Sequence, residues 1–185
     1  MSVWRASFEA ALRMFAAISE ALRETGQPRP ILVGGAAVEY WSGSAVATGD
    51  FDLCSPVQSE LEAVMRDHGF VRPSGAGVST RGWVHPELSL GFEIVGSTPL
   101  DGMVHRDRIP LIENVAPGAT FAILGVEDLI ADRMGQYASG TAPDRIEQAR
   151  LLFHLHPDLD RAYLDRRVRE ESAGDYGIED VQFRP

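Results

Sequence analysis

The sequence predicts an α/β protein of the α+β kind, in which a mixed β-sheet is flanked by helices and followed by further helices. Short apolar runs bounded by Gly and Pro are typical of strands, and they occur before residue 125. Longer segments with apolar residues at three- and four-residue steps are typical of amphipathic helices. We therefore expect residues 1–125 to form an α/β core and residues 126–185 to form a C-terminal helical segment and tail.

The first part of the chain alternates between helix and strand signals. A stripe of apolar residues predicts the first helix, which Pro28 and Pro30 prevent from continuing. Pro56 suits the first turn of a later helix, and Gly69 suits its end. The expected elements are a helix over 7–24, a strand over 31–33, a short helix over 35–41, a loop over 42–49, a strand over 50–54 and a helix over 56–68.

The remaining elements follow from the same signals. Asp158 is the expected cap of the last helix, and the tail after residue 171 is expected to be loosely held because it is polar. The expected elements are a strand over 70–72, a loop over 73–82, a hairpin of strands over 83–85 and 88–95, edge strands over 109–115 and 120–124, and helices over 126–138, 143–153 and 158–171.

The composition restricts the possible functions. The 185 residues carry a formal net charge of −10, and such a charge repels nucleic acid at long range. We expect no indiscriminate DNA or RNA binding. No apolar run is long enough to cross a membrane, and the N-terminal residues lack the layout of a signal peptide. The single cysteine, Cys54, excludes an internal disulfide framework and favours a cytoplasmic location.

Three acidic residues on expected neighbouring strands form the candidate catalytic group. Asp50 and Asp52 lie two residues apart in a strand, so their side chains point to the same face, and Phe51 points into the core. Glu93 alternates with Phe92 in the same way. Adjacent carboxylates repel each other unless they are protonated or bridged by a cation, and oxygen donors favour a hard ion. We expect the three acids to hold Mg²⁺ or Mn²⁺.

A glycine pair precedes these acids. Gly34 and Gly35 follow the strand over 31–33 and begin the short helix. Such a turn lets a phosphate approach backbone N–H groups at the positive end of a helix. Divalent cations neutralise a triphosphate and stabilise the leaving pyrophosphate. The glycine turn and the acids together favour nucleotidyl transfer from an NTP.

The ordered motifs resemble those of the polymerase-β-like nucleotidyltransferase superfamily, in particular its small bacterial members, the minimal nucleotidyltransferases and the abortive-infection toxins. The matching residues are Val33-Gly34-Gly35, Thr48-Gly49-Asp50-Phe51-Asp52-Leu53, Phe92-Glu93-Ile94 and the segment 125–133. The resemblance implies that Gly34 and Gly35 contact the triphosphate and that Asp50, Asp52 and Glu93 hold the metal. It also makes Arg133 a phosphate ligand, and Thr48 is a further candidate for nucleotide binding.

The sequence departs from the family at two positions. Ala36 and Ala37 follow the glycines where a serine is frequent, and Val46 stands where related small enzymes often carry arginine. Both departures remove an expected contact to phosphate. They keep open a second function, that of a toxin–antitoxin component or nucleotide-binding module that acts through a protein partner with weak or no catalysis.

Simpler interpretations of the same residues also remain open. Asp50 and Asp52 suit a solvent-facing edge strand, and Gly34-Gly35 suits a plain tight turn. Arg133 suits a helix surface beside acidic neighbours, and Thr48 suits a local hydrogen bond in the loop. A phosphohydrolase would use the same metal ligands. The acceptor hydroxyl of a transferase is open between tRNA, a protein and a small molecule.

Overall fold

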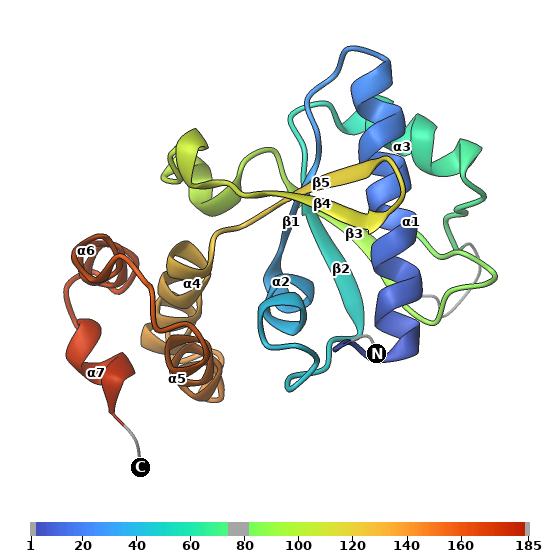
Figure 1. Ribbon diagram of the computed structural model, residues 1–185. Helices are drawn as coiled ribbons and strands as arrows, with labels where there is room; N and C mark the ends of the chain where they lie inside the picture. The colour runs from blue at the N-terminus through green and yellow to red at the C-terminus, as the bar shows by residue number, and fades with distance from the viewer. Residues whose placement is uncertain (1–2, 74–81, 184–185) are drawn as a thin grey trace.

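The computed structural model describes residues 3–73 and 82–183, and it confirms the α+β fold class. Five strands form one mixed sheet in the order β3-β2-β1-β5-β4 (Figure 1). β1 pairs antiparallel with β2 and parallel with β5, while β2–β3 is parallel and β4–β5 antiparallel. The strands are β1 (Ile31–Val33), β2 (Asp50–Cys54), β3 (Gly91–Gly96), β4 (Leu111–Ala116) and β5 (Ala119–Ile123).

The strand predictions are confirmed to the residue for β1 and β2 and corrected elsewhere. β5 is an interior strand between β1 and β4, so only β4 of that pair lies at the edge of the sheet. The expected hairpin is reduced to β3 and two isolated bridges, which pair Val71 with Val84 and Trp83 with Phe92. The physical reason is that β3 pairs with β2, a strand distant in sequence, rather than with the segment just before it. Most of the expected loop over 73–82 lies outside the described residues.

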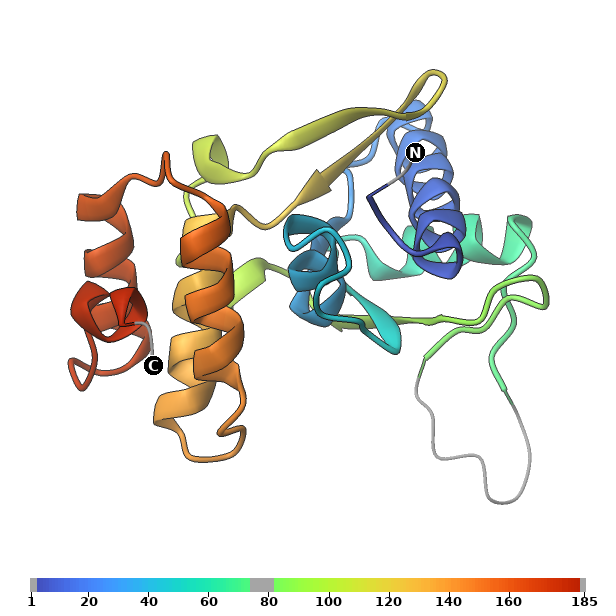
Figure 2. The same ribbon diagram turned by 60° about the horizontal axis from the view of Figure 1, so that its bottom comes forward.

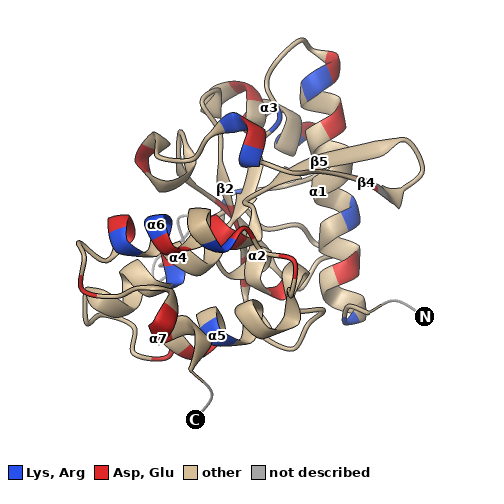
Figure 3. Ribbon diagram, turned by 60° about the vertical axis from the view of Figure 1, so that its left-hand side comes forward, with Lys and Arg blue, Asp and Glu red and all other residues tan. Residues whose placement is uncertain are grey.

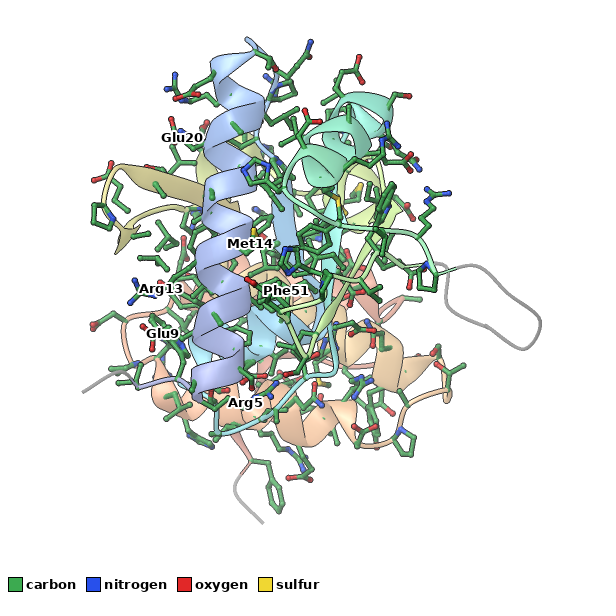
Figure 4. The ribbon with its side chains drawn as sticks, turned by 90° about the vertical axis from the view of Figure 1, so that its right-hand side faces the viewer. Arg5, Glu9, Arg13, Met14, Glu20 and Phe51 are labelled. Carbon is green, nitrogen blue, oxygen red and sulfur yellow. The ribbon has the colours of Figure 1, made fainter. Side chains whose placement is uncertain are left out.

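Helix α1 (Ala6–Glu24) covers one face of the sheet together with α3 (Gln58–Asp67). Its apolar stripe packs on a cluster of aromatic rings that the strands present to it. Phe51 and Phe92 stack with their ring centroids 4.8 Å apart, and Phe15 contacts both of them. Figure 4 shows Phe51 beside the inner face of α1. Because side chains alternate along β2, Asp50 and Asp52 point away from this core.

Helix α2 (Gly34–Trp41) lies between the sheet and the C-terminal helices (Figure 1). The C-terminal helices form a separate group beside it, as Figure 2 also shows. They are α4 (Val126–Ala138), α5 (Arg145–Leu155), α6 (Arg161–Glu171) and α7 (Ile178–Gln182). They carry both acidic and basic residues (Figure 3). None of the helices in the described part of the chain is both long and apolar enough to cross a membrane.

Two predictions for the C-terminal part are wrong. The helix α6 is capped by Asp160, whose side chain accepts from the backbone N–H of Tyr163, and Asp158 precedes this cap. The tail is held, because α7 buries Val181 completely. The backbone N–H of Ile178 also donates to Asp165 Oδ1 at 2.9 Å. Burial of one apolar side chain and these polar contacts offset the polarity that predicted a loose tail.

A buried ionic network joins α4 to α6. Asp128 and Arg167 are each only 1% exposed, and Arg167 Nε donates to Asp128 Oδ1 at 2.8 Å. The Tyr163 hydroxyl donates to the same carboxylate at 2.8 Å. Arg167 also donates to Glu170 and Glu171. Because each buried charge has partners, the network fixes the position of the end of α6.

Candidate functional site

A cavity of about 1100 Å³ lies between the ends of β1 and β2 and helices α4, α5 and α6. Six of the seven candidate residues from the sequence line it, and these are Gly34, Gly35, Thr48, Asp50, Asp52 and Arg133. They come from the turn between β1 and α2, the loop before β2, the strand β2 and the helix α4. The structure therefore brings together residues that lie up to a hundred positions apart in the chain.

Glycine is required in the turn after β1 because Asp52 lies very close to its backbone. Gly34 has φ +62°, a left-handed conformation that residues with a Cβ rarely adopt. A Cβ on Gly34 would overlap the Asp52 Oδ2 atom and would lie 2.9 Å from the Asp52 Cβ. A Cβ on Gly35 would lie 2.5 Å from Thr48 Oγ1. The two glycines therefore do more than form a tight turn. The absence of a side chain at each leaves space for a residue of the cavity wall.

Asp52 lies in a crowded electrostatic environment. Burial raises the pKa of the Asp52 carboxyl to about 6, and the charges of Asp50 and Glu93 add to this shift. The backbone N–H of Gly35, which donates to the carboxylate, and the charge of Arg133 oppose it. The ionised form of Asp52 is therefore unfavourable in the metal-free protein, and a bound cation would stabilise it.

Glu93 lies beside Asp52 but lines a different hollow. The two residues are register partners in the parallel pair β2–β3. Glu93 borders a smaller hollow of about 500 Å³ together with Trp83 and Arg72. Among residues 3–73 and 82–183, no group of three or more His, Cys, Asp or Glu side chains is arranged closely enough to hold a metal ion. The structure thus places Asp50 and Asp52 in the cavity and Glu93 in the smaller hollow beside it.

Thr48 makes the local hydrogen bond that the sequence predicted and also lines the cavity. It lines the cavity, and its hydroxyl donates locally to the Asp50 carbonyl oxygen at 3.1 Å. Its backbone N–H donates to Glu39 Oε2 at 2.6 Å, and its carbonyl oxygen accepts from Arg5 Nη2 at 2.6 Å. Thr48 is therefore fixed through its backbone, while its side chain lies between Gly35 and Asp50.

Arg133 is not a helix-surface residue. It is 4% exposed, and its Nε donates to Asp132 Oδ2 at 3.0 Å. Asp132 also accepts from Gln136 Nε2, and Gln136 Oε1 accepts from Arg145 Nε at 3.2 Å. A chain of polar contacts therefore runs from α4 to α5 along the cavity wall, and it holds the guanidinium of Arg133 near Asp52.

The cavity also contains acidic residues that the sequence analysis did not single out. Asp132 on α4, Asp101 in the 3₁₀ turn Pro99–Gly102, and Glu170 and Glu171 on α6 all line it. With Asp50 and Asp52, six carboxylates and the guanidinium groups of two arginines, Arg133 and Arg145, line the wall within the described residues. Only Asp132 had a sequence signal, because it lies one helical turn from Gln136 and next to Arg133.

The carboxylates of the cavity also affect the pKa of Cys54. The residue is 4% exposed and lies at the end of β2. Burial raises the pKa of its thiol to about 11, and the charges of Asp52, Asp132 and Asp101 contribute. A thiol held protonated in this way is a poor nucleophile. The cavity therefore offers carboxylate chemistry.

Comparison with known proteins supports the fold of this site. No family model and no curated protein matches the sequence. Among solved structures, the chain is similar to the solution structure of the antibiotic-resistance factor ANT(2'')-Ia, an aminoglycoside nucleotidyltransferase, with a TM-score of 0.53 and 19% sequence identity. The match covers 89% of this chain and 90% of that chain. The chain therefore shares the overall fold of that protein.

Proposed function

We propose that this protein is a metal-dependent nucleotidyltransferase that moves a nucleotide from an NTP to a hydroxyl group of a cationic small molecule. The observation that carries the proposal is the pair Asp50 and Asp52 in the wall of the cavity, with Asp52 directly against the glycine turn. The fold similarity to a nucleotidyltransferase supports the reaction class. A cytoplasmic location, where Mg²⁺ and NTPs are present, belongs to the same proposal.

The donor set of the cavity suits Mg²⁺ or Mn²⁺. Asp50 and Asp52 offer carboxylate oxygens only. The raised pKa of Asp52 reflects its burial first and then repulsion by Asp50 and Glu93, and a bound divalent cation would offset both. Asp50 and Asp52 would hold the ion. Glu93, the register partner of Asp52 on β3, would have to turn out of the smaller hollow to join them. A bound divalent ion supplies charge neutralisation for the phosphates and for the leaving pyrophosphate.

The residues around these carboxylates suit a triphosphate. Gly34 and Gly35 present bare backbone at the start of α2, where the helix dipole favours an anion. Arg133 adds a positive charge from the opposite wall, and Thr48 adds a hydroxyl between the turn and Asp50. These groups would orient the nucleotide so that its α-phosphate lies beside the carboxylates.

The acidic surplus of the cavity supports a cationic acceptor. Six carboxylates and two guanidinium groups line its described wall, and Glu170 and Glu171 lie on the helical side away from β2. Such a field attracts cations and repels RNA, which makes tRNA the least suitable of the three acceptor classes. The fold neighbour ANT(2'')-Ia is an aminoglycoside nucleotidyltransferase, and aminoglycosides carry both amino and hydroxyl groups.

Product analysis tests the proposal directly. The protein is incubated with Mg²⁺, an NTP labelled at the α-phosphate, and either an aminoglycoside or a neutral oligosaccharide of similar size. We expect labelled aminoglycoside, no labelled oligosaccharide, and loss of product in Asp50→Asn and Asp52→Asn. Glu171→Gln should raise the KM for the aminoglycoside more than that for the NTP. Release of inorganic phosphate without a labelled acceptor would instead indicate a phosphohydrolase.

One observation favours the alternative of a partner-binding module with weak or no catalysis. Both arginines of the cavity wall are already paired with aspartates, Arg133 with Asp132 and Arg145 with Asp144. This pairing weakens their attraction for phosphate. Calorimetric titration with Mg²⁺-NTP separates the two functions, because a partner-binding module would show no heat, or the same heat in an Asp50→Ala/Asp52→Ala variant.

A further inference from the structure

The loop before β2 is held by a buried carboxylate outside the cavity. Glu39 on α2 has no exposed surface, yet it is charged and accepts four hydrogen bonds. Two come from Arg5, with Nε donating to Oε1 at 2.6 Å and Nη2 donating to Oε2 at 3.0 Å. The others come from the Ser44 hydroxyl at 2.8 Å and the backbone N–H of Thr48 at 2.6 Å.

Arg5 completes this connection from the start of α1, where Figure 4 labels it. Besides its two bonds to Glu39, Arg5 Nη2 donates to the carbonyl oxygen of Thr48 at 2.6 Å. Both backbone polar groups of Thr48 are therefore bound by one ion pair. A planar guanidinium with several fixed donors suits this arrangement, and an ammonium group cannot reproduce it.

The hydrogen bonds to Glu39 and Arg5 hold the loop in a backbone conformation that its residues do not favour. Gly43 has φ +59° and Ser44 has φ +61°, and the left-handed region is unfavourable for a serine. Ser44 is held there because its hydroxyl donates to Glu39 and accepts from the backbone N–H of Arg5 at 3.1 Å. Strain of this kind persists only where the surroundings impose it, and it is frequent near functional sites.

Thr48 transmits this constraint to the cavity. Its hydroxyl donates to the carbonyl oxygen of Asp50, and its Oγ1 occupies the space beside Gly35. We infer that Arg5 and Glu39 are positioning residues, which hold Thr48 against Gly35 and thereby fix the start of β2 at Asp50. The inference rests on the proposed function for its catalytic consequence, and neither residue lines the cavity.

The variant Arg5→Lys tests this role with little risk of unfolding, because the positive charge opposite Glu39 is kept. The matched control is Arg29→Lys. Arg29 also binds a carboxylate, that of Glu20, and donates to the carbonyl oxygen of Thr120. Thr120 lies near the start of β5, whereas the cavity residue Leu124 follows the end of that strand.

The first readout is amide hydrogen exchange, which needs no activity. In Arg5→Lys we expect the amides of residues 44–50 to exchange about tenfold faster, as for the loss of one hydrogen bond that holds a loop. Arg29→Lys should leave them unchanged. Glu39→Gln, which keeps the shape of the side chain but removes its charge, should reproduce the effect of Arg5→Lys. Unchanged exchange in Arg5→Lys would overturn the inference.

The second readout is the affinity for Mn²⁺ and the split between kcat and KM. We expect Arg5→Lys to bind Mn²⁺ about fivefold to tenfold more weakly and to lower kcat more than it changes the KM for the NTP. Faster exchange with unchanged Mn²⁺ affinity would overturn the positioning role, because the pair would then only stabilise the loop. A wild-type protein without Mn²⁺ or NTP binding would refute the proposed function, while hydrogen exchange would still decide whether Arg5 and Glu39 hold the loop.

Discussion

Replacement of Asp52 by asparagine should stabilise the metal-free protein while abolishing its activity. In the fold the pKa of this carboxyl is raised from its ordinary value of 3.8 to about 6. The folded state therefore binds a proton more tightly than the unfolded state, and the charged form destabilises the fold at every pH above about 6. The shift of about two units corresponds to roughly 3 kcal/mol, and partial solvent screening reduces it to about 1–2 kcal/mol.

Urea unfolding of the wild type and Asp52→Asn in EDTA measures this gain. Asparagine keeps an oxygen that accepts the Gly35 N–H, so the contact to the glycine turn is retained. The gain should be full at pH 7.5 and should become small below about pH 3.5, where the aspartate is mostly protonated in both the folded and the unfolded state. Asp158→Asn, a change at an exposed aspartate, should leave the unfolding free energy unchanged at both pH values.

Saturating Mg²⁺ should reverse the order of stability. A ligand that binds only the folded state stabilises it by about 2.7 kcal/mol at a roughly hundredfold excess over its Kd. The wild type should gain this amount, and Asp52→Asn should gain little, since half of the carboxylate pair is gone. If the variant is less stable than the wild type in EDTA at pH 7.5, or if Mg²⁺ stabilises both proteins equally, the account of Asp52 as a repelled metal ligand is wrong.

Three further predictions concern the fold around the cavity. Gly34→Ala should cost at least about 2 kcal/mol and abolish nucleotide binding, whereas Gly26→Ala, at a similar φ of +81° with no atom within 4 Å of its new Cβ, should cost about 1 kcal/mol in urea unfolding. Arg167→Met leaves Asp128 buried without its charge partner and should cost about 3–5 kcal/mol in the same assay. Burial opposes the charge of Glu39, but hydrogen bonds from Arg5, Thr48 and Ser44 hold its pKa below the ordinary 4.5. Its stabilising effect is therefore full above pH 4.5 and lost as the pH falls further, so acid unfolding should be shallower in Glu39→Gln than in the wild type.

The local features of the site were predictable from sequence. The strands β1 and β2 have the predicted bounds because apolar runs, glycine breaks and strict alternation are local signals. The same alternation predicted that Phe51 faces the core and that Asp50 and Asp52 share the opposite face. Gly34 needed no tertiary knowledge either, since a glycine pair between an apolar run and a helix indicates a special turn.

Tertiary structure decided which distant residues meet these local features. The parallel register of β2 and β3 places Glu93 beside Asp52 yet at a separate hollow, and no local pattern encodes that register. The packing of α4 and α6 against the cavity brings in Asp132 and Glu171, and it buries an arginine that the helix pattern allowed on the surface. Sequence periodicity reports which face of an element is apolar, whereas the partner of that face depends on the free energy of packing the whole chain. For this reason the chain alone determined the paired acids and the glycine turn, and only the fold decided the acidic wall opposite them.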